Sequence, residues 1–174
     1  MPSSGGPVRR RPLPGSADRA TRLAPVTDTP SPEQLTAYTH QVIPILSAMG
    51  IEVIEAGRND VAARLPFGPN GNHFGSAYAG SLFTVAEVLG GIYASTSLVL
   101  EGAVPLVKRL EIDYRRPANS DVVSRATLSD DEIERILAET QANGKSDFEL
   151  TAELTDEAGT VVATTHGYYQ MRKF

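Results

Sequence analysis

Residues Asn72–Ser81 read NHFGSAYAGS and lead directly into a long apolar stretch without proline that continues to about Leu98. A polar, glycine-rich segment followed by such a stretch predicts a long central helix over residues 79–98. A helix that begins at Ala79 and Gly80 leaves its first backbone N–H groups without intrahelical partners, and its dipole places positive charge there. This helix start is therefore suited to hold a polarised carbonyl oxygen.

One face of this expected helix combines small residues with an acid. At 100° per residue, Gly80, Thr84, Glu87 and Gly91 share a narrow stripe, and the opposite side is apolar. The stripe has the shape of a contact surface for a slender substrate arm or a second copy of the helix. Glu87 lies about 11 Å along the helix from the free N–H groups, so a dimer would be needed to bring acid and amides together. The alternative is that Glu87 faces water and the glycines serve close helix–sheet packing.

The N-terminal half of the domain predicts a helix and a hairpin. Ser31-Pro32-Glu33-Gln34 has the pattern of a capping box with proline at the first helical position, and Pro44 should kink or shorten the helix before it ends at Gly50. Residues 51–56 and 60–67 are β-type runs joined by a Gly-Arg-Asn turn.

The C-terminal half predicts strands interrupted by one short helix. Apolar residues alternate from Leu110 to Tyr114 in a half-buried strand that ends at Pro117, and residues 122–128 are expected as its neighbour. Ser129-Asp130-Asp131-Glu132 is a second capping box, which begins a helix that closes at Asn143-Gly144. Residues 148–154 and 160–171 then form a hairpin. This order indicates an α+β fold in which one antiparallel sheet wraps a buried helix.

Length and composition limit the protein class. The 174 residues suffice for one domain, which we place at 31–174 after a flexible tail at 1–30 that is rich in Pro, Gly, Ser and Arg. A formal net charge of −5 and no basic stripe in the body argue against nucleic-acid binding. The chain has no cysteine and no apolar stretch of signal-peptide or membrane-spanning length, so we expect no membrane association and a cytoplasmic location. The Rossmann, phosphate-loop, zinc-protease and nucleophile-elbow motifs are absent.

The pair Asn72-His73 and the segment Gly75–Glu87 resemble the core motif of PaaI-like hotdog thioesterases, particularly the branch related to the YiiD C-terminal domain. The order of elements from Glu33 to Met171 is also similar to the hotdog layout. The resemblance implies a curved antiparallel sheet around a long central helix. It further implies pairing of two subunits into a continuous sheet, active sites at the subunit interface, and dimers that often pair again into tetramers.

The resemblance also implies roles for individual residues. An acid on the central helix attacks the thioester or activates water, and this position matches Glu87. The amide that holds the carbonyl oxygen matches Ala79, with Gly80 beside it, and the loop residue that orients water or substrate matches Asn72 or His73. Two departures stand out, because the family often has Asp where this chain has Glu87, and a His-Gly pair where it has Tyr78-Ala79. Since Glu reaches one methylene farther than Asp, it is suited to act through water.

The remaining candidates are substrate-binding residues, with a basic group on the strand after the helix. Lys108, Arg109, Arg115 and Arg116 are candidates for contacts to the phosphates of coenzyme A or to an acidic carrier protein, with a solvated strand face as the alternative. The predicted substrate-binding set is His73, Tyr78, Ser81, Thr84, Lys108 and Arg109.

Three functions fit this sequence. The first is hydrolysis of an acyl-CoA or acyl-carrier-protein thioester by a homodimer or tetramer, with Glu87, Asn72, Ala79 and Gly80 as catalytic residues and without cofactor or metal. The second is dehydration or cyclisation of a carrier-bound intermediate on the same fold. The third is a non-catalytic acyl-CoA-binding and dimerisation module.

Overall fold

The computed structural model describes residues 29–174, so the predicted tail at 1–30 falls almost entirely outside the described residues. The elements along the chain are α1 (Pro32–Val42), α2 (Pro44–Met49), β1 (Glu52–Ala56), β2 (Asp60–Leu65), α3 (Phe67–Asn70), α4 (Ala79–Glu87), α5 (Leu89–Ser95), β3 (Ala103–Tyr114), β4 (Val122–Thr127), α6 (Asp130–Asn143), β5 (Lys145–Asp156) and β6 (Val161–Lys173). Within this part of the chain, no helix is both long and apolar enough to cross a membrane.

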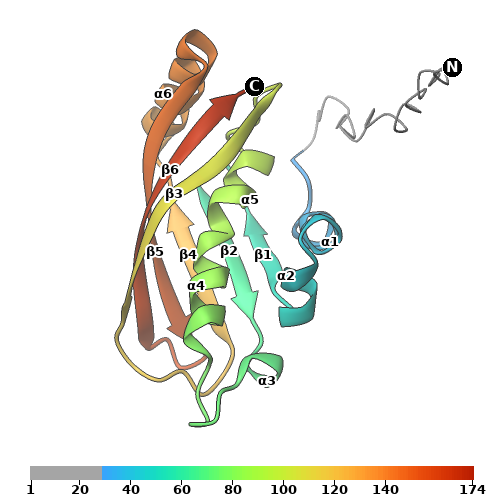
Figure 1. Ribbon diagram of the computed structural model, residues 1–174, viewed down its shortest axis with the longest axis vertical. Coiled ribbons are helices and arrows are strands. Elements are labelled where there is room, and N and C mark those ends of the chain that lie inside the picture. The colour runs from blue at the N-terminus through green and yellow to red at the C-terminus, as the bar shows by residue number, and fades with distance from the viewer. Residues whose placement is uncertain (1–28) are drawn as a thin grey trace, which may run out of the picture.

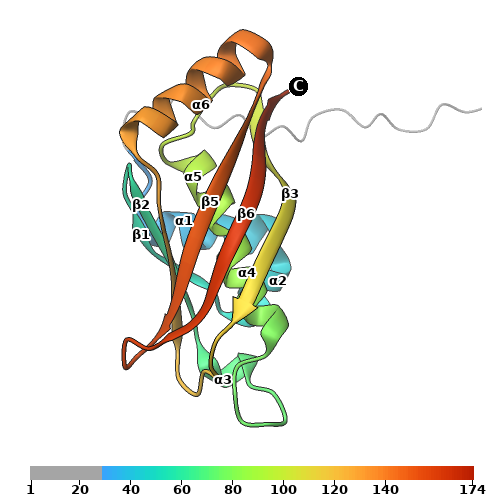
Figure 2. The same ribbon diagram turned by 90° about the vertical axis from the view of Figure 1, so that its left-hand side faces the viewer.

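A six-stranded antiparallel sheet in the order β1-β2-β4-β5-β6-β3 curves around the helices α4 and α5 (Figures 1 and 2). The hotdog fold expected from the sequence is therefore confirmed. The strand β3 lies at one edge of the sheet, and α1 and α2 lie beside β1 at the opposite edge. The edge position of β3 leaves one row of its backbone groups unpaired within the subunit.

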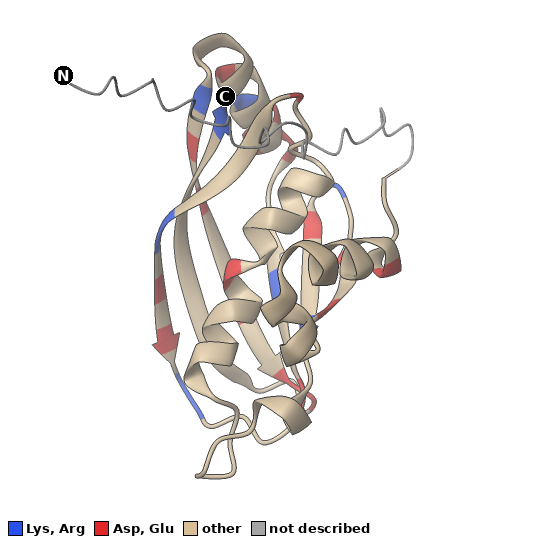
Figure 3. Ribbon diagram, turned by 45° about the vertical axis from the view of Figure 1, so that its right-hand side comes forward, with Lys and Arg blue, Asp and Glu red and all other residues tan. Residues whose placement is uncertain are grey.

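The central helix is buried along its apolar face, as its sequence period predicts. The side chains on this face are less than about a tenth exposed and form the middle of the core: Leu82, Val85, Ala86, Leu89 and Tyr93. The helix runs from Ala79 to Ser95 with one tight turn at Val88, whose carbonyl accepts the N–H groups of both Gly91 and Ile92. It therefore ends three residues before the expected boundary. In Figure 3 its ribbon is uncharged apart from one acidic position, which the sequence identifies as Glu87.

The positions at which the shorter helices begin and end follow the sequence closely. Ser31 and Gln34 form the complete capping box, in which each side chain accepts the other residue's backbone N–H. Pro44 splits the first helix at Ile43, and Gly50 ends α2 in the left-handed conformation. The second capping box is half formed, because Ser129 accepts the Glu132 N–H whereas the Glu132 carboxylate binds Arg135 instead.

One predicted strand pairing is wrong. The sequence pattern predicts residues 122–128 beside the strand that ends near Tyr114, but β4 pairs with β2 and β5, and β3 pairs with β6. The segment between β3 and β4 carries the chain from one edge into the middle of the sheet. Alternation of apolar residues identifies a strand and its buried face, but it does not specify the neighbour, because all antiparallel partners present the same pattern. The structure also extends β3 back to Ala103, through Pro105, which the edge position tolerates.

Tyr169 couples the central helix to the sheet. Its ring lies between Gly90 of α5 and Gly167 of β6, and a Cβ atom built on either glycine would overlap this ring. The ring also stacks on Phe148 of the neighbouring strand, with ring centroids 5.4 Å apart. The two glycines therefore allow the helix and the sheet to approach from both sides of one buried aromatic ring.

This packing makes Gly90 a sensitive position. Alanine is favoured over glycine within a helix by about 1 kcal/mol, but overpacking against a fixed ring costs about 1–3 kcal/mol. We expect Gly90→Ala to lower the free energy of unfolding by up to about 2 kcal/mol in urea denaturation, the difference between these two effects. Gly68→Ala is the control, because no atom lies within 4 Å of the added Cβ. A Gly90→Ala protein as stable as the control would contradict this account of the packing.

Candidate active site

The start of α4 is anchored by the loop before it. Asn70 is buried, and its side-chain amide donates to the carbonyl oxygens of Met49 (2.7 Å) and Pro66 (2.8 Å). The Asn70 carbonyl in turn accepts the N–H of Tyr78 at 2.7 Å, and Ala77 donates its N–H to Ala118 at 2.8 Å. These bonds fix the backbone at Tyr78, which has an extended conformation and precedes the first helical residue.

The predicted loop residues Asn72 and His73 lie at the outer end of this segment. The Asn72 side-chain oxygen accepts the N–H groups of Phe74 (2.8 Å) and Ser76 (3.3 Å), and its amide donates to the Ala77 carbonyl at 3.4 Å. In this subunit the Asn72 side chain therefore shapes the loop. His73 is exposed, and its ring lies 3.9 Å from that of Phe74, which is 81% exposed.

The helix start presents two free backbone donors. Among residues 29–174, neither the Ala79 N–H nor the Gly80 N–H donates a hydrogen bond, and no side chain caps the helix. The ring of Tyr78 lies against Gly80, where an added Cβ would come within 2.5 Å of the ring. A side chain at position 80 would therefore require the exposed Tyr78 ring to move. The free N–H groups lie at the positive end of the helix dipole. That this helix start holds a polarised carbonyl oxygen stays a prediction.

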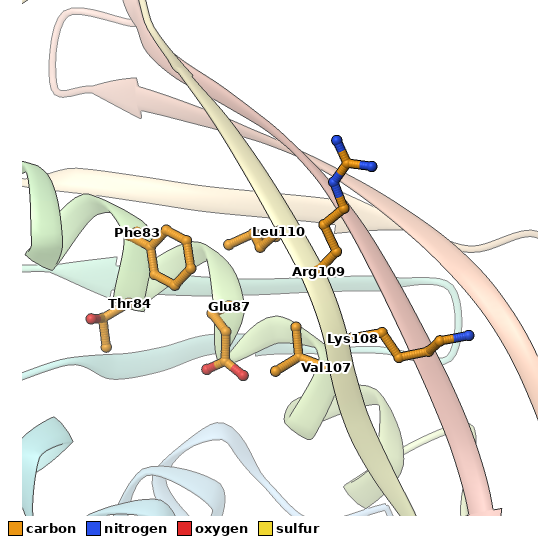
Figure 4. A pocket seen from close by; sticks show the side chains of 7 residues that line it. All are labelled: Phe83, Thr84, Glu87, Val107, Lys108, Arg109 and Leu110. Atoms are coloured by element: carbon orange, nitrogen blue, oxygen red, sulfur yellow. The ribbon is translucent and has the colours of Figure 1, made fainter.

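Glu87 lies near the other end of α4, in a pocket between this helix and β3. The cavity has a volume of about 320 Å³ and is lined by Phe83, Thr84, Glu87, Val107, Lys108, Arg109 and Leu110 (Figure 4). Burial raises the pKa of the Glu87 carboxyl group above its ordinary value. Within the described part of the chain, no group donates a hydrogen bond to this carboxylate, so the pKa is not lowered by a partner. Such a carboxylate is a stronger base than an exposed one.

The basic residues on β3 contribute their stems to this pocket, while their charged groups point away from Glu87 (Figure 4). A β-bulge between Val107 and Arg109 makes Lys108 the extra residue of the strand. Lys108 forms an ion pair with Asp147 at 2.9 Å. Arg109 pairs with Glu111 and lies over the ring of Tyr168. Each of these two charged groups therefore has an acidic partner within the chain.

The other predicted residues lie on the two faces of α4 or in the segment after β3. Thr84 lines the pocket and donates its hydroxyl to the Gly80 carbonyl at 2.8 Å, whereas Ser81 is buried on the core side of the helix. Arg115 pairs with Asp113, and Arg116 is exposed in the segment after β3. The helix-start amides and the acidic pocket are therefore two separate parts of the chain, as the helix spacing predicts.

Four residues of these two parts are not identified as site residues by the sequence pattern. Phe83, Val107 and Leu110 form the apolar walls beside Glu87, and the hydroxyl of Tyr114 donates to the Ala79 carbonyl at 2.9 Å. Alternation counted back from Leu110 would place Val107 on the outer face, and only the bulge turns this residue toward the inner face. Tyr114 could have been noticed as a hydroxyl group at the last inward position of its strand.

The curved antiparallel sheet around a long central helix defines a hotdog-fold protein. The chain belongs to the family described as "Putative thioesterase (yiiD_Cterm)", which it matches over residues 32–173. Comparison with curated protein sequences gives no significant match.

Solved structures support the same assignment. A Pseudomonas aeruginosa protein described as a "Probable Thioesterase" is 35% identical, with a TM-score of 0.77 over 84% of this chain and 99% of that one. Two further structures show the same fold at lower identity. A putative thioesterase from Shewanella oneidensis is 21% identical (TM-score 0.72, 82% of this chain and 97% of that one). A thioesterase from Haemophilus influenzae is 20% identical (TM-score 0.66, 84% and 93%).

The raised pKa of Glu87 predicts a pH-dependent stability. Ionisation of Glu87 opposes folding, because the folded state disfavours the charged form. This destabilisation is absent below the ordinary glutamate pKa of about 4.3, develops as the pH rises through the raised pKa, and is complete above it. Glu87→Gln cannot ionise, so we expect it to melt at a higher temperature than the wild type at pH 8 and at nearly the same temperature at pH 4.

The control is Glu153→Gln, which replaces an exposed acid on the outer face of β5. Calorimetric melting of the three proteins at both pH values gives the comparison. If Glu87→Gln is no more stable than the wild type at pH 8, the burial of an uncompensated charge is contradicted.

Proposed function

We propose that the protein hydrolyses acyl thioesters, with Glu87 as the catalytic acid–base residue and the N–H groups of Ala79 and Gly80 as oxyanion donors. The observation that carries this proposal is the Glu87 carboxylate, which is partly buried and has no hydrogen-bond partner in the described chain. It lies on a helix whose N-terminal amides are free. The family membership and the names of the similar structures support the same reaction class.

The chemistry needs a base and an anion site. Glu87 removes a proton from water, the resulting hydroxide adds to the thioester carbonyl carbon, and the negative charge moves to the carbonyl oxygen. Backbone N–H groups at the helix start stabilise this oxygen, and the carbon–sulfur bond then breaks. The thiolate leaves and takes up the proton that Glu87 removed from water, so the products are one carboxylic acid and one thiol and Glu87 is again ionised. A carboxyl group with a raised pKa suits this role, because proton transfer works best when the pKa is near the working pH.

A dimer would unite the two parts of the site. Ala79 lies beside Tyr114 at the end of β3, and Glu87 lies beside Val107, seven residues earlier on the same strand. If β3 pairs antiparallel with its copy about a two-fold axis near Leu110 and Glu111, residue 114 of one subunit faces the region of residue 107 of the other. Glu87 of the partner subunit would then lie near the helix-start amides. The unpaired edge of β3 offers the backbone groups for such pairing.

The pocket favours an apolar acyl group. Phe83, Val107 and Leu110 provide its apolar lining, and Thr84 adds one small polar group. The substrate we propose is accordingly an acyl-CoA or acyl-carrier-protein thioester whose acyl chain lies along this wall. The Lys108 and Arg109 charges are already paired within the subunit, so binding phosphates would require them to exchange these partners.

Replacement of Glu87 tests the reaction. We expect Glu87→Gln and Glu87→Ala to reduce kcat on acyl-CoA and acyl-carrier substrates by about 10²-fold or more, because general acid–base catalysis contributes about 10²–10⁴-fold. Free thiol is followed with a chromogenic reagent, and mass spectrometry identifies the product. Glu153→Gln should keep full activity.

Each alternative outcome would lead to a different conclusion. Unchanged turnover in the Glu87 variants would remove this residue from the mechanism. An acyl group that is dehydrated or cyclised while still attached to the carrier would replace hydrolysis by a lyase-type reaction. Tight acyl-CoA binding without turnover by the wild type would indicate a binding module.

The dimer geometry can be tested by cross-linking, because the chain has no cysteine. Glu111→Cys places one thiol near the proposed two-fold axis, so we expect a covalent dimer on mild oxidation or with a short bis-maleimide. Glu149→Cys is the matched control on the same outer face, two strands away on β5. At about 4.8 Å per strand, the two thiols introduced by this control would lie about 24 Å apart. Equal cross-linking of both variants would contradict pairing through β3.

A further inference from the structure

The peptide unit between Ala79 and Gly80 has its two ends in different environments. Its carbonyl oxygen accepts the hydroxyl of Tyr114 at 2.9 Å. Its N–H group, which belongs to Gly80, has no acceptor among residues 29–174. One planar unit therefore connects the Tyr114 hydroxyl group to a free donor of the helix start.

The preceding peptide unit shows the same arrangement. The Tyr78 carbonyl accepts the N–H groups of both Ser81 (3.0 Å) and Leu82 (3.1 Å), whereas the Ala79 N–H at the other end of this unit is free. Hydrogen bonds to a carbonyl polarise the peptide and strengthen its N–H as a donor, by about 10–30% per bond. The backbone of the helix supplies this polarisation for Ala79, and a side chain from another element adds to it for Gly80.

Tyr114 is well placed to hold this peptide in one orientation. It is the last residue of β3, and its hydroxyl bridges the end of this edge strand to the first turn of α4. The helix has no side-chain cap that could fix its first peptide units. Partial burial raises the pKa of the Tyr114 hydroxyl, with a further contribution from Tyr78, so the group remains protonated and able to donate.

We propose that Tyr114 is a positioning residue of the hydrolytic site, which orients and polarises the Ala79–Gly80 peptide so that the Gly80 N–H holds the developing oxyanion. This proposal rests on the proposed thioesterase function. Tyr114 acts through the peptide and does not touch the reacting atoms. Removal of a direct oxyanion donor costs about 10²–10³-fold in kcat, so loss of an indirect contribution should cost less.

The kinetic test compares Tyr114→Phe with Tyr38→Phe, a control that removes a hydroxyl from an exposed tyrosine on α1. We expect kcat for acyl-CoA hydrolysis to fall about tenfold in Tyr114→Phe while KM stays within about twofold, because the affected interaction forms in the transition state. Tyr38→Phe should match the wild type. A Tyr114→Phe enzyme with wild-type kcat overturns the proposal.

A spectroscopic test reports on the peptide without relying on activity. Labelling with ¹³C-carbonyl alanine and ¹⁵N-glycine selects Ala-Gly peptides, of which the chain has three, at 56–57, 79–80 and 158–159. In Tyr114→Phe the carbonyl carbon of Ala79 and the amide of Gly80 should both shift upfield, as loss of a hydrogen bond to the carbonyl requires. The other two signals should stay in place and show that the fold is intact.

The two tests separate the two proposals. If the wild type hydrolyses thioesters but the 79–80 signal does not move in Tyr114→Phe, the role of Tyr114 is overturned and the thioesterase function stands. If the signal moves but the wild type hydrolyses no thioester on the panel, the thioesterase function fails and the catalytic role of Tyr114 fails with it. A shifted signal together with a kcat effect supports both.

Discussion

The packing of one helix face against the curved sheet is the constraint on which the rest of the structure depends. The apolar side of α4 and α5 lies against the inner face of the strands, and the Tyr169 ring between Gly90 and Gly167 sets how closely helix and sheet approach. Once this face is buried, the opposite stripe of Gly80, Thr84, Glu87 and Gly91 must turn away from the core. A single amphipathic helix thereby places both parts of the candidate site, the free amides at its start and the acid two turns later.

Much of this arrangement could be predicted from the sequence, because it depends on local patterns. The capping box at Ser31, the break at Pro44 and the central helix all follow from residues adjacent in the chain. The division of the central helix into a buried and a less buried face also follows from its period. The motif Gly75–Glu87 indicates the fold class without information on strand pairing. The structure adds the pairing.

The remaining features could not be predicted because they depend on contacts between distant segments. Nothing in the Leu110–Tyr114 pattern specifies that β3 pairs with β6 instead of β4. The bulge at Lys108 shifts the strand by one residue, which turns Val107 toward Glu87 and the Lys108 charge toward Asp147. The sequence suggests Lys108 and Arg109 as phosphate ligands, but it does not show that each side chain pairs with an acid of the same chain. The Tyr114 hydroxyl bond to Ala79 likewise joins residues 35 positions apart.

The two departures from the usual family pattern, at Tyr78-Ala79 and at Glu87, are best considered together. At the helix start, where the family resemblance predicts a His-Gly pair, the Tyr78 ring lies against Gly80. At the acid, Glu87 extends one methylene farther than Asp and lies in a pocket with apolar walls, which raises its pKa. In the proposed dimer, a longer acid would reach farther toward the helix-start amides of the partner subunit, and a water between acid and carbonyl would suit a general base better than a direct nucleophile. Glutamate at position 87 therefore fits the proposal that the base acts through water.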